Sequence, residues 1–331
     1  MRVVSLLPSA TEILTLIGGE PLLVGKGHEC DFPESIGSLP KLTKPRAGVG
    51  FKADPETGDS NGSILAPVCD PSAAGHPLYT LDEAALASLR PDLILTQGPG
   101  SACSVDPETI GQVADGLSPR PEILSLSPTS VEDMFDDILR VGEAVGLVRE
   151  ARDAVVSLRG RLHTAAERVN PYVDGPRVGF MAWSDPVFIA GHWTVQLIER
   201  AGGRHPLNET VPKPGSGAAA GPQQAERTAG KSIAVSNEVF AASLPEFIVI
   251  APCGLTLDEA TREGERLMGE PWFAQLPAAR AGRVAAVDGS QMFNRPGPRL
   301  IDAFEWLAGW LNNRPELIPG NFPWRLIGSA G

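Results

Sequence analysis

The sequence has few cysteines and no long apolar run. Only four of the 331 residues are cysteine, which excludes the disulfide frameworks of small secreted domains. No apolar stretch reaches the ~18 residues that a membrane-spanning helix needs. Acidic residues outnumber basic ones by 40 to 28, and the formal net charge is −12. This balance excludes nucleic-acid backbones and anionic membranes as partners, because both select Lys and Arg.

Common enzyme signatures are also missing. Neither the phosphate-loop pattern G-x-x-x-x-G-K-[ST] nor the zinc pattern H-E-x-x-H occurs in the chain. Of the residues present, 42% are apolar. The chain is also longer than the ~100–200 residues that are usual for one domain. We therefore expect a folded protein with two lobes and a sizeable core.

The first residues are expected to belong to the folded domain. Val3–Leu7 predicts a buried strand, and Ser9 to Glu12 fits a capping box that opens a helix ending at Gly18. Pro8 interrupts the apolar run and Glu12 puts a charge in it, so the segment differs from a signal peptide. We expect a cytoplasmic protein; a leader removed upstream would place it in the periplasm or at the cell surface.

Strand and helix patterns alternate along most of the chain, which predicts an α/β fold with mainly parallel sheets. We expect two Rossmann-like lobes, at residues 1–147 and 172–331, joined by one long connecting helix at 148–171. Further capping boxes are predicted at Thr80 to Glu83 and at Thr129 to Glu132. Two Gly- and Pro-rich segments, 44–78 and 204–236, are predicted to be long loops.

The chemically distinctive side chains come directly after predicted strands. In open α/β sheets, ligands bind outside the carboxyl ends of the strands. If the two lobes face one another, these residues line a single ligand cleft between them. They are His28, Cys30, Cys103, Trp183, His192, Trp193, Cys253, Gly254, Phe293 and Arg295.

The cysteines allow three interpretations. His28, Cys30, Cys103 and Cys253 could assemble a metal site across the cleft, for zinc, iron or copper, although no C-x2-C pair is present. Cys30 could be a catalytic thiol with His28 as its base, since residues i and i+2 share a face of an extended segment. The third interpretation is that the thiols are small buried apolar groups.

The aromatic residues also have two interpretations. Trp183, Trp193 and Phe293 could offer flat apolar faces to a large planar ligand, or they could be core anchors. Arg295 stands between prolines just before the last predicted helix. It could bind a ligand carboxylate, amide or phosphate, or form an ion pair within the protein.

Several motifs together resemble a known family. The opening Arg2-Val-Val-Ser-Leu-Leu-Pro-Ser-Ala-Thr-Glu-Ile, which contains Ser9, is similar to the cobalamin-binding branch of the iron-siderophore and vitamin B12 periplasmic-binding superfamily. The other motifs are His28-Glu29-Cys30-Asp-Phe-Pro, Arg90-Pro-Asp-Leu-Ile-Leu-Thr-Gln, Ala190-Gly-His-Trp, Ala251-Pro-Cys-Gly and Phe293-Asn-Arg-Pro-Gly-Pro-Arg. The likeness covers nearly the whole chain outside 44–78 and 204–236.

The resemblance implies two α/β lobes and a non-enzymatic binding protein that holds cobalamin, another corrinoid or a related metal chelate. It adds Ser9 and Glu29 to the candidate ligand-binding residues, and His28 or His192 could bind cobalt. We expect a monomer, with an ABC transporter permease as partner only if the chain is exported. The alternative is a cytosolic enzyme or metal-handling protein that uses the Cys and His cluster on the same fold.

Overall fold

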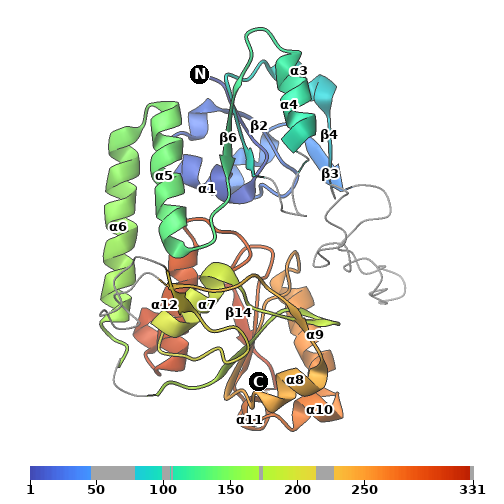
Figure 1. Cartoon of the computed structure of the whole chain (residues 1–331), viewed down its shortest axis with the longest axis vertical. Helices are drawn as coiled ribbons and strands as arrows, with labels where there is room; N and C mark the ends of the chain where they lie inside the picture. The colour runs from blue at the N-terminus through green and yellow to red at the C-terminus, as the bar shows by residue number, and fades with distance from the viewer. Residues whose placement is uncertain (46–78, 99–104, 106, 171–173, 214–226, 329–331) are drawn as a thin grey trace. The chain divides into compact units, whose positions relative to one another are not determined.

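The computed structural model describes residues 1–45, 79–98, 105, 107–170, 174–213 and 227–328. The chain divides into two compact units. Unit 1 holds Met1–Pro128 and Glu132–Ser157, and unit 2 holds Thr129–Val131 and Leu158–Gly331. Each unit has its own sheet, coloured blue to green for unit 1 and yellow-green to red for unit 2 in Figure 1. In the described part of the chain, no helix is both long and apolar enough to cross a membrane.

Unit 1 is built on a four-stranded parallel sheet in the order β2-β1-β5-β6. Its strands are β1 (Val3–Ser5), β2 (Leu23–Lys26), β5 (Leu93–Gln97) and β6 (Glu122–Leu126). β1 and β5 are almost fully buried, as expected for strands covered on both faces. The carboxyl ends of all four strands therefore lie at one edge. A separate antiparallel pair joins β3 (Thr43–Pro45) to β4 (Tyr79–Leu81).

The helices of unit 1 include α1 (Pro8–Leu16), α3 (Glu83–Leu89) and α4 (Pro107–Asp115). Two predicted capping boxes are wrong. α1 begins with Pro8 in its first turn and has no side-chain cap, because proline already fits the first helical position. α3 is capped by Asp82, whose carboxylate accepts the Ala85 N–H at 2.9 Å, while Thr80 lies in β4.

Two long helices follow, α5 (Val131–Val145) and α6 (Val148–Ala166). They lie side by side in Figure 1, and their close approach is possible because Gly142 of α5 faces Ala151 of α6. α6 is the long helix that the spacing of apolar residues predicts. It crosses from unit 1 to unit 2 after Ser157 without a break.

Unit 2 is built on a six-stranded mixed sheet in the order β11-β8-β7-β12-β13-β14. β7, β12 and β13 run parallel, whereas β8, β11 and β14 are each antiparallel to a neighbour. The strands are β7 (Val178–Ser184), β8 (Val187–Ile189), β11 (Ala234–Val235), β12 (Phe247–Ile250), β13 (Val284–Val287) and β14 (Trp324–Leu326). The parallel core of both sheets confirms the predicted α/β fold.

The predicted loop at 204–236 is partly wrong, because it contributes short strands. They are β11, β9 (Val211–Pro212) and β10 (Arg227–Thr228). The helices of unit 2 are α7 (His192–Arg200), α8 (Asn237–Ala242), α9 (Leu257–Met268), α10 (Pro271–Ala274), α11 (Pro277–Arg280) and α12 (Leu300–Leu311). Each unit has a cluster of buried apolar side chains. The cluster of unit 1 lies around β4, β5 and α4, and the cluster of unit 2 lies around β12, β13 and α9.

Candidate ligand-binding surfaces

In unit 1, the predicted residues lie at the carboxyl edge of the sheet. Just beyond β2, the Gly27 N–H donates to the Ser5 carbonyl at the end of β1, with N and O 2.8 Å apart. The Cys30 thiol donates to the same carbonyl over 3.7 Å. Ser9 lies in the first turn of α1 and is buried. Adjacent parallel strands therefore bring Ser9, His28 and Cys30 to one edge.

His28 is held by two hydrogen bonds to one hydroxyl. Its backbone N–H donates to Thr43 Oγ1 at 2.9 Å, and its Nδ1 lies 2.7 Å from the same oxygen. The edge of the imidazole meets the Tyr79 ring at 83°, with ring centroids 4.6 Å apart. The Tyr79 hydroxyl in turn donates to Glu29 Oε1 at 2.8 Å. The side chain of His28 is thus fixed by residues from β3 and β4.

The electrostatics keep His28 neutral. Burial, with a smaller contribution from the nearby Lys41 cation, lowers the pKa of His28 to about 4. Both effects disfavour the imidazolium, which would carry its charge in a poorly solvated place beside another positive group. At neutral pH the ring therefore keeps a nitrogen lone pair.

The cysteines that could share a metal site belong to different parts of the chain. Cys30 is 1% exposed, which fits the buried apolar interpretation better than a reactive thiol. Cys30 belongs to unit 1 and Cys253 to unit 2, while Cys103 lies outside the described residues. Among the residues described, no three His, Cys, Asp or Glu side chains gather as a metal site.

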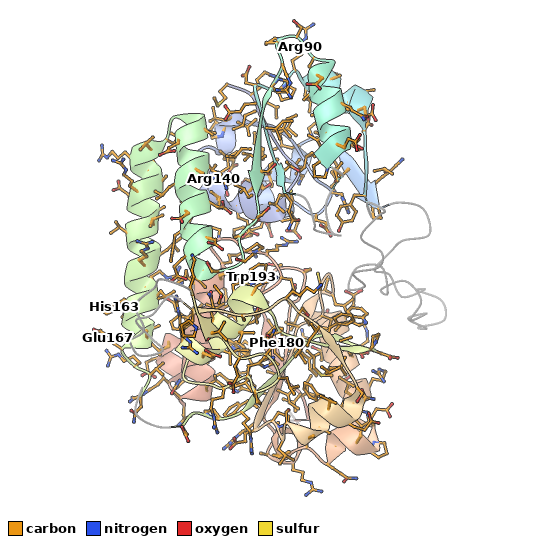
Figure 2. All side chains as sticks on the ribbon, viewed as in Figure 1. Arg90, Arg140, His163, Glu167, Phe180 and Trp193 are labelled. Carbon is orange, nitrogen blue, oxygen red and sulfur yellow. The ribbon has the colours of Figure 1, made fainter. Side chains whose placement is uncertain are left out.

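In unit 2, Trp193 is the centre of an aromatic surface. It lies at the start of α7 (Figure 2), half-buried, and its indole N–H donates to the Phe293 carbonyl oxygen at 2.6 Å. The His192 ring stacks on it, with centroids 5.8 Å apart and planes 24° apart. Two backbone positions beside this contact are left-handed, with φ of 49° at His192 and 65° at Phe293. A left-handed backbone is uncommon at residues other than Gly.

The placement of His192 has a different cause from the one predicted. β8 is antiparallel to β7, so the carboxyl-end rule for parallel strands does not apply to it. α7 instead begins where Gly191 passes close to the 231–232 backbone; a Cβ at Gly191 would lie 2.1 Å from Ser232 N. This close passage places His192 and Trp193 against the loop that follows β13.

The Phe293 ring does not face outward as expected. It is 1% exposed and packs edge-on against Phe180 and Trp306, with centroids 5.1 Å and 6.0 Å away. Its contribution to the surface is the carbonyl oxygen that holds Trp193. The expectation that this ring stacks on a ligand is therefore wrong for this conformation.

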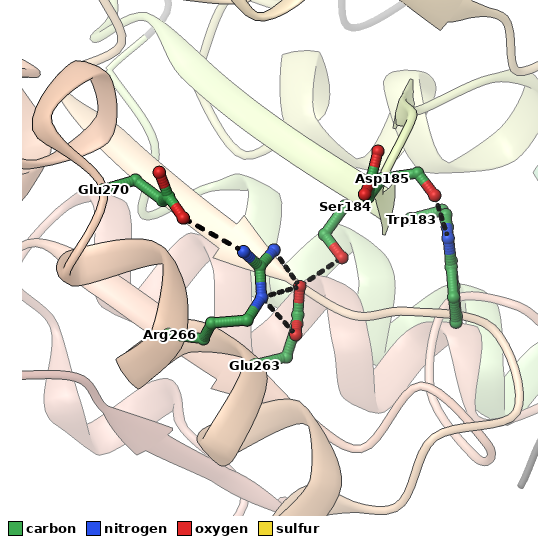
Figure 3. Close-up of polar contacts among 6 residues, drawn as sticks. All are labelled: Trp183, Ser184, Asp185, Glu263, Arg266 and Glu270. Carbon is green, nitrogen blue, oxygen red and sulfur yellow. Dashed lines mark hydrogen bonds and ion pairs between the residues drawn. The ribbon is translucent and has the colours of Figure 1, made fainter. Parts of the chain in front are cut away.

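Trp183 is likewise mostly core, at 8% exposed. Figure 3 shows its indole N–H donating to the Asp185 carbonyl, over 2.9 Å. The next residue, Ser184, donates to Glu263 of α9 at 2.5 Å, and Arg266 binds the same carboxylate at 2.7 Å. These hydrogen bonds fix the turn between β7 and β8. Trp183 therefore anchors this turn and has little surface left to offer a ligand.

The remaining predicted residues lie on the loops after β12 and β13. The Cys253 N–H donates to the Ala182 carbonyl at 3.1 Å, and Gly254 has a φ of 80°. Asn294 joins the two loops by donating to the Ala251 and Gly289 carbonyls at 3.1 and 2.8 Å. Cys253, Gly254 and Arg295 are all half-buried, so the loops present them at the carboxyl edge of the sheet.

Some residues of these surfaces were not predicted. Thr43 and Tyr79 contact His28 and come from the β3–β4 pair, whose strands are far apart in sequence. Lys41, which also affects His28, lies before β3 and is bridged to Lys26.

Asn294 was also not predicted, although it stands between Phe293 and Arg295 in a motif that the sequence analysis singled out. An amide side chain at that place was the feature that could have indicated its role in joining the loops.

Comparison with known proteins agrees with this geometry. No curated protein is detectably similar to the chain in sequence. A periplasmic heme-binding protein from Pseudomonas aeruginosa shares the fold with a TM-score of 0.65 and 22% identity, over 94% of this chain and 92% of its own. The periplasmic vitamin B12 binding protein of Vibrio cholerae gives 0.62 and 18%, over 95% and 98%. An ABC transporter substrate-binding protein from Listeria monocytogenes gives 0.60 and 15%, over 94% and 98%.

These comparisons confirm the family expected from the motifs. They do not support a cytoplasmic location, because the matching family and the neighbours from P. aeruginosa and V. cholerae are described as periplasmic. The sequence match extends over residues 3–290, from β1 to the loop after β13. The chain is a member of the periplasmic binding protein family.

Proposed function

We propose that this chain is a non-enzymatic binding protein for cobalamin, another corrinoid or a related planar metal chelate such as heme. Structural neighbours are named for binding heme and vitamin B12, which share a metal in a large flat macrocycle. We further propose that it acts outside the cytoplasm and passes its ligand to an ABC transporter.

The observation that carries this proposal is the stacked His192–Trp193 pair. A flat macrocycle gains most from an aromatic face that is already oriented, because less side-chain entropy is lost on binding. The Trp193 indole meets this condition, since its N–H is bonded to the Phe293 carbonyl and its ring is supported by His192. Its half-buried ring has area left for a ligand.

Polar groups around this face would provide orientation. Arg295 comes two residues after Phe293, and its guanidinium suits the carboxylates of heme or the amides and phosphate of cobalamin. Cys253 and Gly254, on the loop after β12 of the same unit, belong to the proposed binding set. Trp183 and Phe293 support this surface from the core, in line with their burial. In unit 1, Glu29 is proposed as a ligand-binding residue at the carboxyl edge of its own sheet, whereas Ser9 and Cys30 are buried there.

The test is calorimetric titration of the purified protein with hydroxocobalamin and with hemin. We expect one site per chain for at least one chelate, with a dissociation constant in the micromolar range or below. Replacing Trp193 by Leu removes the flat face and should weaken binding at least tenfold, as for other central aromatic anchors.

The matched control is Trp272→Leu, a partly buried indole of the same unit that packs against Phe240 and Phe273. It should leave the affinity within about twofold, provided that circular dichroism shows a folded protein. Absence of heat with both chelates, or equal affinities for the two variants, would contradict the proposal.

A further inference from the structure

We infer that the aromatic face of Trp193 is coupled to the antiparallel β9–β10 pair through Gln196, a positioning residue on α7. The inference rests on the proposed function and adds the regulation of that site. A chelate bound on Trp193 stabilises the β9–β10 pair, and a change that displaces the pair weakens chelate binding. Every residue that carries the argument belongs to unit 2.

The first observation is the spacing of side chains on α7. Gln196 lies three residues after Trp193, and Glu199 lies three residues after Gln196. Residues three apart are neighbours on the surface of a helix. A shift or rotation of α7 therefore moves the indole together with the two polar side chains, and the groups that bind these side chains also fix the position of the indole.

The second observation is that Gln196 is bonded at both ends of its amide. The residue is 2% exposed. Its Oε1 accepts the N–H of Val131, the first residue of α5, at 2.9 Å, and its Nε2 donates to the Arg227 carbonyl in β10. A buried amide of this kind holds one arrangement, because a shift would leave buried donors and acceptors without partners.

Glu199 joins α7 to the other strand of the pair. Its carboxylate accepts the N–H of Thr210 at 2.8 Å and also the Thr210 hydroxyl. Thr210 directly precedes β9 and is 3% exposed. Arg227 then donates from Nε to Thr210 Oγ1 at 2.7 Å and from Nη2 to the Thr210 carbonyl at 2.6 Å. The hydrogen bonds thus form a closed network between α7, β9 and β10.

The residues that flank the pair also hold the start of α7. The His192 N–H donates to the Gly230 carbonyl at 2.9 Å. The side-chain nitrogen of Asn208 lies 2.9 Å from the Ala190 carbonyl and 3.2 Å from the carbonyls of Gly230 and Lys231. The segments on both sides of the pair therefore contribute to the place where Trp193 leaves the helix.

The β9–β10 pair itself has little stability of its own. Each strand has two residues, and Val211 is 59% exposed, so few apolar contacts stabilise the pair. Elements of this kind open more easily than the core, and the order of this one depends on its polar bonds to α7. Because coupling free energies are reciprocal, a ligand that fixes α7 also stabilises the pair.

The test is hydrogen–deuterium exchange of the full chain with and without hemin or hydroxocobalamin, followed in peptides that cover 208–213 and 227–232. We expect a bound chelate to slow exchange in both segments several-fold. Gln196→Met keeps the length of the side chain but removes both hydrogen bonds. It should weaken the affinity measured by calorimetry about tenfold and abolish the slowing at saturating chelate. Thr210→Val, which breaks the contact with Glu199, should act in the same direction and serves if Gln196→Met does not fold.

Ser236→Ala is the control. It removes the cap that accepts the Val239 N–H at the start of α8, so it lowers stability without changing the α7 network, and it should keep the wild-type affinity and slowing. Wild-type behaviour of folded Gln196→Met, or unchanged exchange in both segments of the chelate-bound wild type, would overturn the coupling and leave the proposed function intact. A wild type that binds neither chelate would overturn the proposed function and the coupling with it.

Discussion

At the scale of single residues, His205 shows how burial sets sensitivity to acid. The side chain is 1% exposed, its Nδ1 lies 2.9 Å from the Val178 carbonyl, and burial lowers its pKa. An unfolded chain takes up this proton near pH ~6.5, whereas the folded chain resists it. The unfolded state therefore binds more protons below that pH, and the free energy of unfolding falls as the pH falls.

We predict that His205→Asn reduces this acid sensitivity. The Asn amide can still donate to the Val178 carbonyl but does not titrate, so the fall in unfolding free energy between pH 7 and pH 5 should become shallower. Urea unfolding followed by circular dichroism at several pH values measures it. His163→Asn, which changes an exposed histidine, should keep the wild-type slope; an equal change in both variants would exclude burial as the cause.

Residue types at the site were predictable from the sequence, but their surroundings were not. Phe293 comes after a predicted strand and before Arg295, so the sequence correctly places it on a loop at the carboxyl edge of the sheet. Its ring nevertheless turns inward onto Phe180 and Trp306, because a φ of 65° reverses the local direction of the backbone. A sequence pattern gives no information about that angle at a residue other than Gly or Asn.

At the scale of elements, two helical glycines allow opposite predictions. A methyl group at Gly142 of α5 would lie 2.3 Å from the Ala151 Cβ of α6, whereas a methyl at Gly160 of α6 meets no described atom within 4 Å. Alanine is favoured over glycine inside a helix by ~0.5–1 kcal/mol, but overlap in a close contact costs ~1–3 kcal/mol.

We therefore expect Gly160→Ala to raise the free energy of unfolding by ~0.5–1 kcal/mol and Gly142→Ala to lower it by ~1–2 kcal/mol. Chemical denaturation of the two variants beside the wild type checks both signs. If Gly142→Ala were also stabilising, α5 and α6 would not pack as closely as described.

The turn after β13 depends on one carboxylate. Asp288 is buried and accepts the N–H groups of Ser290, Gln291 and Leu257 at 3.0, 3.1 and 3.2 Å. Through Leu257 it also ties this turn to the start of α9. The turn leads into the loop whose Phe293 carbonyl holds Trp193.

We predict that Asp288→Ala lowers the free energy of unfolding by about 3 kcal/mol, because three backbone donors lose a charged acceptor. It should also weaken chelate binding in protein that remains folded, as measured by calorimetry. Asp258→Ala removes an exposed carboxylate paired with Arg325 and should change stability by less than ~0.5 kcal/mol. Equal effects of the two substitutions would contradict this role for Asp288.

Elements with a clear apolar period were predictable, whereas their ends and directions were less so. Strand β13 and helices α6 and α12 follow from runs of Val, Leu and Phe. Both Thr80 and Asp82 are residue types that cap helices, so the sequence alone does not distinguish them. Asp82 caps α3, because Thr80 pairs with Lys44 in the β3–β4 ladder. The direction of β8 depends on the tight turn at Asp185, which local patterns do not determine.

At the scale of the whole molecule, the family could be predicted because its motifs are spread along the chain. The six-stranded sheet and the separate β3–β4 pair were not fully predictable, because β3–β4, β11–β8 and β13–β14 join segments distant in sequence. Such pairings depend on tertiary packing, which a single sequence encodes only indirectly. The environment of His28 is the clearest example, since Thr43 and Tyr79 come from such a pair.

Native mass spectrometry of the chain mixed with equimolar hydroxocobalamin or hemin tests the central claim most directly. Binding of a planar metal chelate by an oriented aromatic face predicts a complex heavier by one chelate, which is reduced in Trp193→Leu and retained in Trp272→Leu. A spectrum that shows only the free chain with both chelates, under conditions in which circular dichroism shows it folded, would contradict the claim.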